Sequence, residues 1–174
     1  MVIFFLIKAG IFTVMQQAYI QTPLGITLIE GDESGISKIH VLNDEVHVSE
    51  EIPAILQAAA KQLEDYFNGI RKNFDFALNP QGTDFQKKVW KALLEIPFGK
   101  TTSYQELSIK LGDIKAIRAV ASANGKNPLW IVVPCHRVIG SDGSLTGYAG
   151  GLWRKKWLLE HETPPINKAC FRFS

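Results

Sequence analysis

Cys135 is the residue of this chain best suited to nucleophilic chemistry, and His136 and Arg137 follow it directly. Thiolate is the reactive form of cysteine, and neighbouring positive charge favours it. A histidine can take the thiol proton and activate the sulfur. These residues therefore predict a nucleophilic site. The alternative is a packing role for Cys135, because free cysteine is among the most buried residue types, and one adjacent histidine does not decide between the two.

The segment before the cysteine predicts how Cys135 is presented. Residues 129–133 form an apolar run that is rich in β-branched side chains and too short for a helix, so we expect a buried strand. Pro134 should end that strand, because proline cannot donate a hydrogen bond to a sheet. Cys135 would then lie where a dry strand gives way to a turn.

Composition indicates an ordinary soluble protein. The chain has 174 residues, 46% hydrophobic and 21% charged, which is enough for one domain or two small ones. Its two cysteines, Cys135 and Cys170, form neither a disulfide framework nor a zinc-ligand spacing. We therefore expect a reducing, cytoplasmic location and no membrane contact.

Charge is distributed unevenly along the chain. Residues 16–82 contain 4 Lys or Arg and 10 Asp or Glu, whereas residues 83–160 contain 12 and 6. The half that carries Cys135 is basic, as a module that contacts phosphates would be. A solvated basic surface would give the same pattern, so charge alone leaves both interpretations open.

The first fourteen residues do not fit the rest of the chain. Residues 2–7 are apolar, but the run is too short to span a bilayer and lacks the features of a signal peptide. We interpret residues 1–14 as an N-terminal extension or a misassigned start, with translation beginning at Met15. N-terminal sequencing of the native protein would test this.

Residues 15–79 predict a small α/β domain that offers no chemistry of its own. Strands are expected at 18–22, 26–30 and 36–41, separated by turn signals, and should form an antiparallel meander. Apolar residues recur at helical spacing over 52–67, and Asn68 with Gly69 should end that helix. A further strand is expected at 74–78, from its alternating pattern.

Residues 80–174 predict a mostly helical domain. Thr83 with Gln86, and Ser103 with Glu106, match the capping box that begins a helix. A third helix should run over residues 114–124 after a glycine turn. Two short helices joined in this way suggest a helix-turn-helix, and a plain helical hairpin fits equally well. A last helix should end near residue 162, followed by an irregular tail from Thr163.

The third of these helices should have two distinct faces. Its core face is predicted to hold Ile114, Ile117 and Ala121. Its other face would be free to meet DNA, and it carries Lys115, Arg118 and Ser122.

Several motifs of residues 80–162, taken together, resemble those of the O6-alkylguanine-DNA alkyltransferases, the suicide repair proteins of methylated DNA. The resemblance implies an α+β two-domain fold: an RNase H-like N-terminal α/β domain with an antiparallel sheet and a helix, and a winged helix-turn-helix-like C-terminal domain. The matching motifs are Thr83-Asp84-Phe85-Gln86, Val89-Trp90, Thr101-Thr102-Ser103-Tyr104, Arg118-Ala119-Val120, Asn127-Pro128, Pro134-Cys135-His136-Arg137-Val138, Gly147-Tyr148-Ala149-Gly150-Gly151, Trp157-Leu158-Leu159 and His161-Glu162.

On matching positions, the resemblance implies a set of catalytic roles. Cys135 takes the alkyl group from O6 of guanine, His136 acts as base through a water molecule, and Glu162 orients His136. Tyr104 supplies a hydrogen bond to the guanine leaving group, and Asn127 braces the turn before the cysteine. The product is a thioether with no hydrolysable bond, so each molecule is expected to react once.

The implied partner is double-stranded DNA containing O6-alkylguanine, from which the nucleotide must be flipped out. O4-alkylthymine is a possible second substrate. Arg118 resembles the residue that fills the vacated place in the base stack. Ser103, Lys115 and Ser122 are the other expected DNA contacts, and Tyr148, Ala149, Gly150 and Val138 are the expected pocket residues.

No cofactor is implied. Some relatives hold zinc in the N-terminal domain, but this chain has no cysteine before Cys135, so we expect no metal. We also expect a monomer. Two other classes of protein remain open: a cysteine hydrolase that uses Cys135 and His136 and turns over repeatedly, and a non-enzymatic helix-turn-helix regulator or lesion binder.

Overall fold

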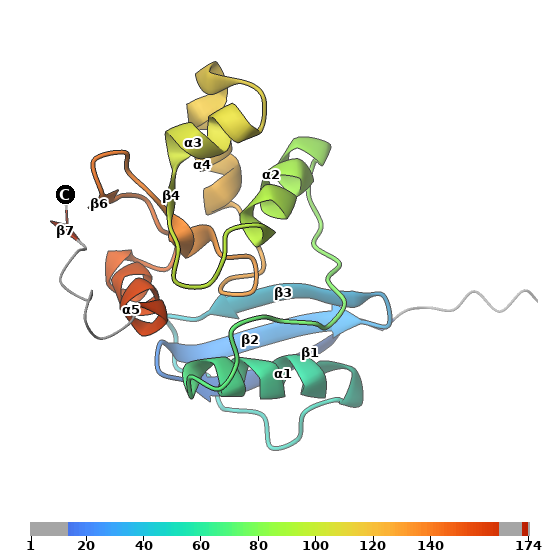
Figure 1. The fold of residues 1–174 in the computed structure, drawn as a ribbon. Helices are drawn as coiled ribbons and strands as arrows, with labels where there is room; N and C mark the ends of the chain where they lie inside the picture. Colours follow the sequence, from blue (N-terminus) through green and yellow to red (C-terminus); the bar gives the residue numbers. More distant parts are fainter. Residues whose placement is uncertain (1–13, 164–171, 174) are drawn as a thin grey trace, which may run out of the picture.

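The computed structural model describes residues 14–163 and 172–173 of the chain. Our interpretation of residues 1–13 and of Cys170 therefore lies outside the described residues. A three-stranded sheet with one helix comes first, and a mostly helical part follows (Figure 1). The main elements are β1 (Gln16–Thr22), β2 (Gly25–Asp32), β3 (Gly35–Val41), α1 (Ala54–Phe67), α2 (Asp84–Leu94), α3 (Tyr104–Lys110), α4 (Ile117–Gly125) and α5 (Leu152–Glu162).

The N-terminal part has the predicted architecture. Its strands pair antiparallel in the order β1-β2-β3, and α1 lies along the sheet (Figure 1). Cross-strand neighbours such as Ala18 with Ile29, and Ile29 with Ile39, are fully buried, so the alternating apolar positions face the core. Asn68 caps α1, and Gly69 follows with a φ of +73°, as the helix-stop signal predicted.

The strand predicted at residues 74–78 is wrong. Only Leu78 makes a bridge, which is parallel and pairs it with Ile36. The alternation in the sequence instead reflects packing, because Phe74 and Phe76 are partly buried against the core and contact each other at 5.9 Å between ring centroids. Burial of every second side chain is thus not sufficient evidence for a strand in this segment.

The helices of the C-terminal part begin where the capping boxes predicted. The Thr83 side chain accepts from the Gln86 amide at 3.2 Å, and the Gln86 side chain accepts from the Thr83 amide at 2.8 Å. Ser103 and Glu106 form the same reciprocal pair before α3. A short parallel pair, β4 (Thr102–Ser103) with β5 (Val138–Ile139), joins the start of α3 to the segment after the cysteine.

The predicted third helix starts with a 3-10 turn, η1 (Ile114–Ala116), and only then becomes α4. Its predicted core face is wrong, because Ile114 is 48% exposed and the buried residues of α4 are Val120, Ala123 and Asn124. The tighter 3-10 turn rotates more per residue than an α-helix, so Ile114 lies off the face that one continuous helix would give it, whereas Ile117 and Ala121 are half-buried on α4.

The strand predicted at residues 129–133 is also wrong, although the segment is buried as expected. Ile131 has a φ of +73°, and the Val133 amide donates to the Leu129 carbonyl at 2.9 Å. The Asn127 side chain also bonds the Leu129 amide and the Val133 carbonyl, at 2.9 and 2.7 Å. These bonds satisfy backbone groups that a strand would offer to a neighbour, so the chain turns instead.

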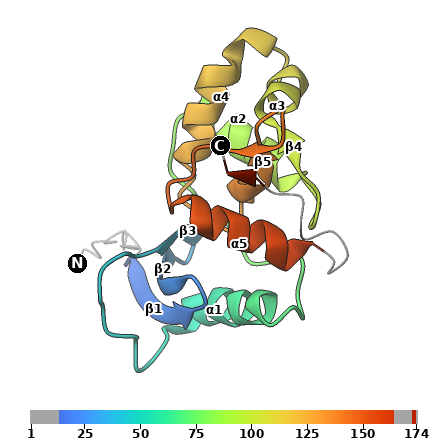
Figure 2. The ribbon, with the colours of Figure 1, turned by 90° about the vertical axis from the view of Figure 1, so that its left-hand side faces the viewer.

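The α5 helix crosses the middle of the molecule, between the sheet with α1 and the helices α2 to α4 (Figure 2). The chain after Thr163 was predicted to be irregular. Arg172–Phe173 (β7) pairs in parallel with Ser144–Leu145 (β6), so this part of the tail is ordered against the fold. Residues 164–171 lie outside the described part of the chain.

The capping box before α2 generates a stability prediction. Replacing Thr83 by Ala should lower the free energy of unfolding by about 1 kcal/mol, because the Gln86 amide loses its acceptor. Urea denaturation measures this change. Thr83→Ser is the matched control, since serine keeps the hydroxyl and should retain most of the stability. Equal stability of wild type and Thr83→Ala would contradict the role of the cap.

Candidate active site

Cys135 begins a short 3-10 turn, η2 (Cys135–Arg137), and its side chain is enclosed. The residue is 3% exposed, and its sulfur accepts a hydrogen bond from Asn127 Nδ2 at 3.1 Å. Because Asn127 also holds the 129–133 turn, one amide fixes both the backbone before the cysteine and the sulfur itself. The predicted bracing role of Asn127 is consistent with this geometry.

The charge around the thiol differs from the sequence-based expectation. Burial raises the pKa of the Cys135 thiol, and the hydrogen bond from Asn127 and the positive charge of Lys155 oppose this without outweighing it. The expected help from the adjacent Arg137 is not seen, because its guanidinium is turned toward Glu162. In this closed arrangement, the thiol is the protonated and unreactive form at neutral pH.

His136 is held by Glu162 from α5. Its Nε2 lies 2.9 Å from Glu162 Oε1, and both side chains are buried. Its Nδ1 is buried and has no hydrogen-bond partner among the described residues. Burial lowers the pKa of His136, against the opposing effect of the Glu162 carboxylate. A neutral ring that donates from Nε2 therefore leaves the Nδ1 lone pair open to accept a proton.

Glu162 collects donors from several parts of the chain. Arg137 donates to both of its oxygens, from Nε at 2.8 Å and from Nη2 at 2.9 Å. The Gly99 amide donates at 3.2 Å and the Tyr66 hydroxyl at 2.8 Å. Burial alone would raise the pKa of the Glu162 carboxyl, but His136 and Arg137 outweigh it and hold this pKa well below its usual range. The buried carboxylate is thus ionised.

Tyr104 and Val138 lie close to the backbone of Cys135. Asn124 Nδ2 connects Tyr104 to Cys135, because it lies 3.5 Å from the Tyr104 hydroxyl and 3.4 Å from the Cys135 carbonyl. Burial raises the pKa of Tyr104, and the negative charge of a Cys135 thiolate adds to this. Val138 is fully buried, and its amide donates to the Cys135 carbonyl. These predicted residues are brought together at the thiol.

The glycine-rich loop closes the site. The Tyr148 hydroxyl is buried without a hydrogen-bond partner among the described residues, and burial raises its pKa well above the ordinary value, with a further contribution from Cys135. Gly150 lies so close to Trp130 that an added Cβ would sit 2.5 Å from the ring. Ala149 is exposed. The loop therefore packs tightly against Trp130.

The four residues expected to contact DNA differ in their exposure. Lys115, Arg118 and Ser122 are exposed on η1 and α4, and α4 lies with α3 on the side of the molecule away from α1 (Figure 1). Ser103 is different, because it is buried and its hydroxyl is engaged with Glu106 in the capping box. Three of the four residues therefore share an accessible surface.

Lys155 of α5 was missed by the sequence analysis. Its side chain is fully buried, and its Nζ donates to the Thr146 carbonyl at 2.7 Å and lies 5.8 Å from the centre of the Tyr104 ring. Burial lowers the pKa of Lys155 to about 8, and the charge of Cys135 opposes this. A signal existed, because Lys155 shares a helix face with Leu158 and Glu162, at spacings of three and seven.

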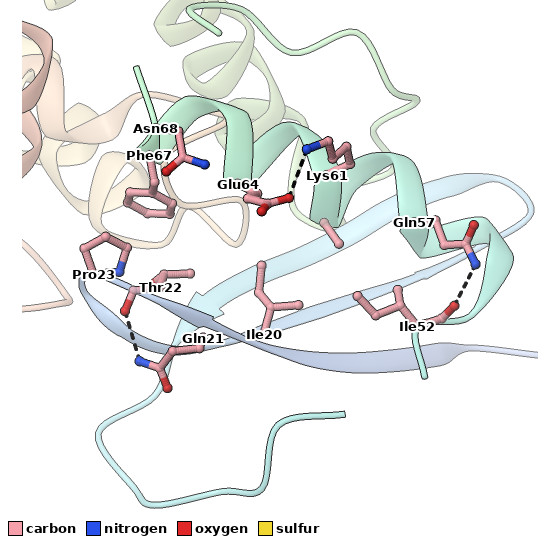
Figure 3. A pocket seen from close by; sticks show the side chains of 11 residues that line it. Ile20, Gln21, Thr22, Pro23, Ile52, Gln57, Lys61, Glu64, Phe67 and Asn68 are labelled. Atoms are coloured by element: carbon pink, nitrogen blue, oxygen red, sulfur yellow. Dashed lines mark hydrogen bonds and ion pairs between the residues drawn. The ribbon is translucent and has the colours of Figure 1, made fainter. Parts of the chain in front are cut away.

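The N-terminal part has a groove of its own, of about 460 Å³, between β1 and α1. Ile20 and Phe67 contribute apolar surface to it, and Lys61 and Glu64 form an ion pair at its rim (Figure 3). No cysteine or histidine lines the groove, so it is separate from the thiol site. Within residues 14–163 and 172–173, no group of His, Cys, Asp and Glu could hold a metal, and no helix could span a membrane.

Fold and site together define a two-domain protein with a buried cysteine, a Glu-oriented histidine and a basic helical surface. The family model described as "6-O-methylguanine DNA methyltransferase, ribonuclease-like domain" matches residues 15–80, and the one described as "6-O-methylguanine DNA methyltransferase, DNA binding domain" matches residues 84–164. The chain belongs to this family of O6-methylguanine DNA methyltransferases. The predicted family and fold class are confirmed.

Relatives and solved structures agree with this assignment. A methylated-DNA–protein-cysteine methyltransferase of Methanosarcina barkeri is 49% identical over 150 residues, which cover 82% of this chain and 94% of the relative. The crystal structure of the Mycobacterium tuberculosis O6-methylguanine methyltransferase matches with a TM-score of 0.77 and 41% identity, over 87% of this chain and 96% of that one. The Mycobacterium tuberculosis OGT in complex with DNA has the same TM-score and 43% identity, over 87% and 97%.

The buried thiol generates a prediction about its reactivity. The rate of Cys135 alkylation by iodoacetamide should be low at neutral pH, because burial disfavours the thiolate. The rate should rise only at pH values above the ordinary cysteine pKa of about 8.5. Peptide mass spectrometry at a series of pH values separates Cys135 from Cys170. Protein unfolded in urea is the control and should show an ordinary profile at both cysteines. A midpoint near pH 7 for Cys135 in the folded protein would contradict the argument.

Proposed function

We propose that this protein repairs DNA by transferring the alkyl group, in particular methyl, from O6-alkylguanine to the sulfur of its own Cys135. The observation that carries the proposal is the buried thiol held by Asn127 beside a histidine whose Nε2 is fixed by Glu162 and whose Nδ1 is open. The family supplies the reaction class, and these contacts support the assignment of the acceptor. No cofactor takes part in the proposed reaction.

The proposed reaction begins with loss of the thiol proton. His136 accepts it at Nδ1, directly or through a bridging water, and the imidazolium that results is stabilised by the buried Glu162 carboxylate. Lys155 supports the thiolate through its positive charge. The sulfur then attacks the saturated carbon of the alkyl group, so an S–C bond forms as the bond from carbon to O6 breaks.

The electron pair of the broken bond remains on the guanine. Tyr104 is proposed to donate a hydrogen bond there as negative charge develops, and burial keeps its hydroxyl protonated. The base regains a proton and is restored as guanine. The thioether on Cys135 has no bond that water can hydrolyse, which makes the transfer irreversible and limits each molecule to one event. A cysteine hydrolase would instead regenerate its thiol.

Access to the stacked base requires flipping of the nucleotide. Arg118, which is exposed on α4, is proposed to fill the vacated place in the base stack. Lys115 and Ser122, on the same surface, are proposed to contact the DNA backbone. Ser103, at the start of α3, is proposed as a further DNA contact. Tyr148, Ala149, Gly150 and Val138 are proposed to line the pocket. The contacts of Gly150 and Tyr148 with Trp130 hold this loop in place beside the thiol.

The remaining proposals concern organisation. Residues 15–79 and 80–174 are proposed as the two domains. The protein is proposed to act as a cytoplasmic monomer on double-stranded DNA containing O6-alkylguanine, and O4-alkylthymine is a possible second substrate. The basic character of residues 83–160 supports a DNA-contacting surface in the second domain.

Intact-mass spectrometry tests the proposed transfer directly. Incubation with a duplex oligonucleotide containing O6-methylguanine should add one methyl group per protein molecule, located on the peptide that contains Cys135. Cys135→Ser is the matched control and should still bind the lesion duplex but acquire no methyl. Restoration of guanine without modification of Cys135, or repeated turnover, would overturn the proposal.

Arg118→Ala tests the proposed stack-filling role. The variant should transfer methyl from duplex DNA several times more slowly, while its rate on single-stranded DNA should change little, because only the duplex leaves a gap to fill. Lys115→Ala is the control, since it removes a charge from the same surface and should affect both substrates similarly. Single-turnover rates on both substrates give the comparison. Equal slowing of the two by Arg118→Ala would refute the role.

A further inference from the structure

Tyr66 of the N-terminal domain contacts Glu162, the carboxylate that holds His136. It lies in the last turn of α1, its ring is fully buried, and its hydroxyl donates to Glu162 Oε1 at 2.8 Å. The same oxygen lies 2.9 Å from His136 Nε2. One carboxylate oxygen is thus shared between the imidazole of the C-terminal domain and a phenol that is 96 residues away from Glu162 in sequence.

We infer that Tyr66 is a positioning residue for alkyl transfer, which fixes Glu162 and thereby the histidine that receives the thiol proton. This inference rests on the proposed function of Cys135 and His136. It assigns to the N-terminal domain, which the sequence analysis credited with no chemistry, a direct part in arranging the site.

The hydroxyl is not needed for packing. The Tyr66 ring already contacts Phe67, Phe74, Phe98 and His161, at centroid distances of 5.4, 5.6, 6.2 and 5.1 Å. A phenylalanine ring could make these contacts equally well. Burial of a hydroxyl is unfavourable unless it is hydrogen-bonded, so the tyrosine is explained by what its oxygen does at Glu162.

Tyr66 is also held through its backbone. Its carbonyl accepts a hydrogen bond from His161 Nε2 at 2.8 Å, and His161 stacks on Trp157 at 4.9 Å between ring centroids. Two consecutive residues of α5, His161 and Glu162, therefore bind the two polar ends of one residue of α1. This double contact sets the position of Glu162 relative to α1 as well as relative to η2.

The hydrogen bond has a predictable electrostatic effect. Donation to a carboxylate stabilises its charge and lowers its basicity. Without the Tyr66 hydroxyl, Glu162 should interact more strongly with His136 and raise the pKa of the imidazole, since the carboxylate already acts in that direction. Burial and the charge of Glu162 raise the pKa of Tyr66 well above its ordinary value, so the hydroxyl stays a donor over the working pH range.

Other charged and titratable groups face the same pair and must stay constant in a test. Arg137 from η2 binds Glu162, and Lys155 from α5 lowers the pKa of His136 by its charge. The negative charge of Glu162 contributes to the raised pKa of Tyr148 from the glycine-rich loop. None of these is altered by removing one oxygen from Tyr66, so a Tyr66→Phe variant isolates the shared hydrogen bond.

The test measures single-turnover methyl transfer from an O6-methylguanine duplex as a function of pH, in the full-length protein. Tyr66→Phe should slow transfer about fivefold at neutral pH, the equivalent of roughly 1 kcal/mol for one lost hydrogen bond. The rising limb of its pH–rate profile should move to higher pH, because His136 must be neutral to accept the proton. Affinity for the methylated duplex should stay unchanged.

Phe67→Leu is the matched control for a purely structural effect. Phe67 packs on Trp157 and on the Tyr66 ring at the same junction, but its apolar side chain cannot hydrogen-bond Glu162, so the variant disturbs packing and keeps the Tyr66 hydroxyl. This variant should lower the melting temperature and leave the transfer rate and the pH profile as in wild type. A second comparison uses Glu162→Ala as background, where adding Tyr66→Phe should cause no further slowing, because the acceptor of the Tyr66 hydroxyl is already gone.

The outcomes separate this inference from the proposed function. If wild-type protein transfers methyl to Cys135 and Tyr66→Phe keeps the wild-type rate and pH profile, the positioning role is refuted and the function stands. If Phe67→Leu reproduces the slowing and the pH shift, Tyr66 acts only through packing, which also refutes the role. If wild-type protein transfers no methyl, the proposed function itself fails.

Discussion

The ionised carboxylate of Glu162, buried between the two domains, is the constraint on which the site depends. A buried charge is costly unless it is paired and hydrogen-bonded, and this one is satisfied by donors from three places in the chain. Arg137 and His136 come from η2, the Gly99 amide from the segment after α2, and Tyr66 from α1. Because these donors must converge, the same requirement fixes the relative positions of α1, α5 and the turn that carries Cys135.

Around this fixed carboxylate, the thiol is kept in an inactive form. Burial raises the pKa of Cys135, while Asn127 and Lys155 act in the opposite direction. A protein that reacts once gains from such an arrangement, because a freely ionised thiolate would be consumed by any small electrophile before a lesion is found. In the proposed reaction, a base that enters beside Tyr148 would change the surroundings of the sulfur, so that reactivity would depend on the substrate.

The sequence predicted the parts of the fold that local signals control. Capping at Thr83, the meander and the helix that carries Glu162 all followed from short-range patterns. In the two strands that were predicted wrongly, side-chain packing or a side-chain hydrogen bond replaced the expected backbone pairing. The Asn127 side chain hydrogen-bonds the Leu129 amide and the Val133 carbonyl, which a strand at residues 129–133 would have paired with a neighbouring strand. Lys155 was not singled out from the sequence, although its helix face carried a signal, and nothing local marked the hydroxyl of Tyr66 as different from its ring.

These failures change the view of the N-terminal domain. From sequence it offered no chemistry, yet its edge strand β3 holds the turn before Cys135, since the Ile39 amide donates to the Pro128 carbonyl at 2.8 Å and the Trp130 amide donates back to Ile39 at 3.0 Å. Its helix α1 supplies Tyr66 to Glu162 from the other side. The cysteine turn and the histidine's partner are thus each anchored to the same small domain. In the proposed reaction, nucleophile and base would keep their relative position because the cysteine turn is anchored to β3 and the partner of His136 is anchored to α1.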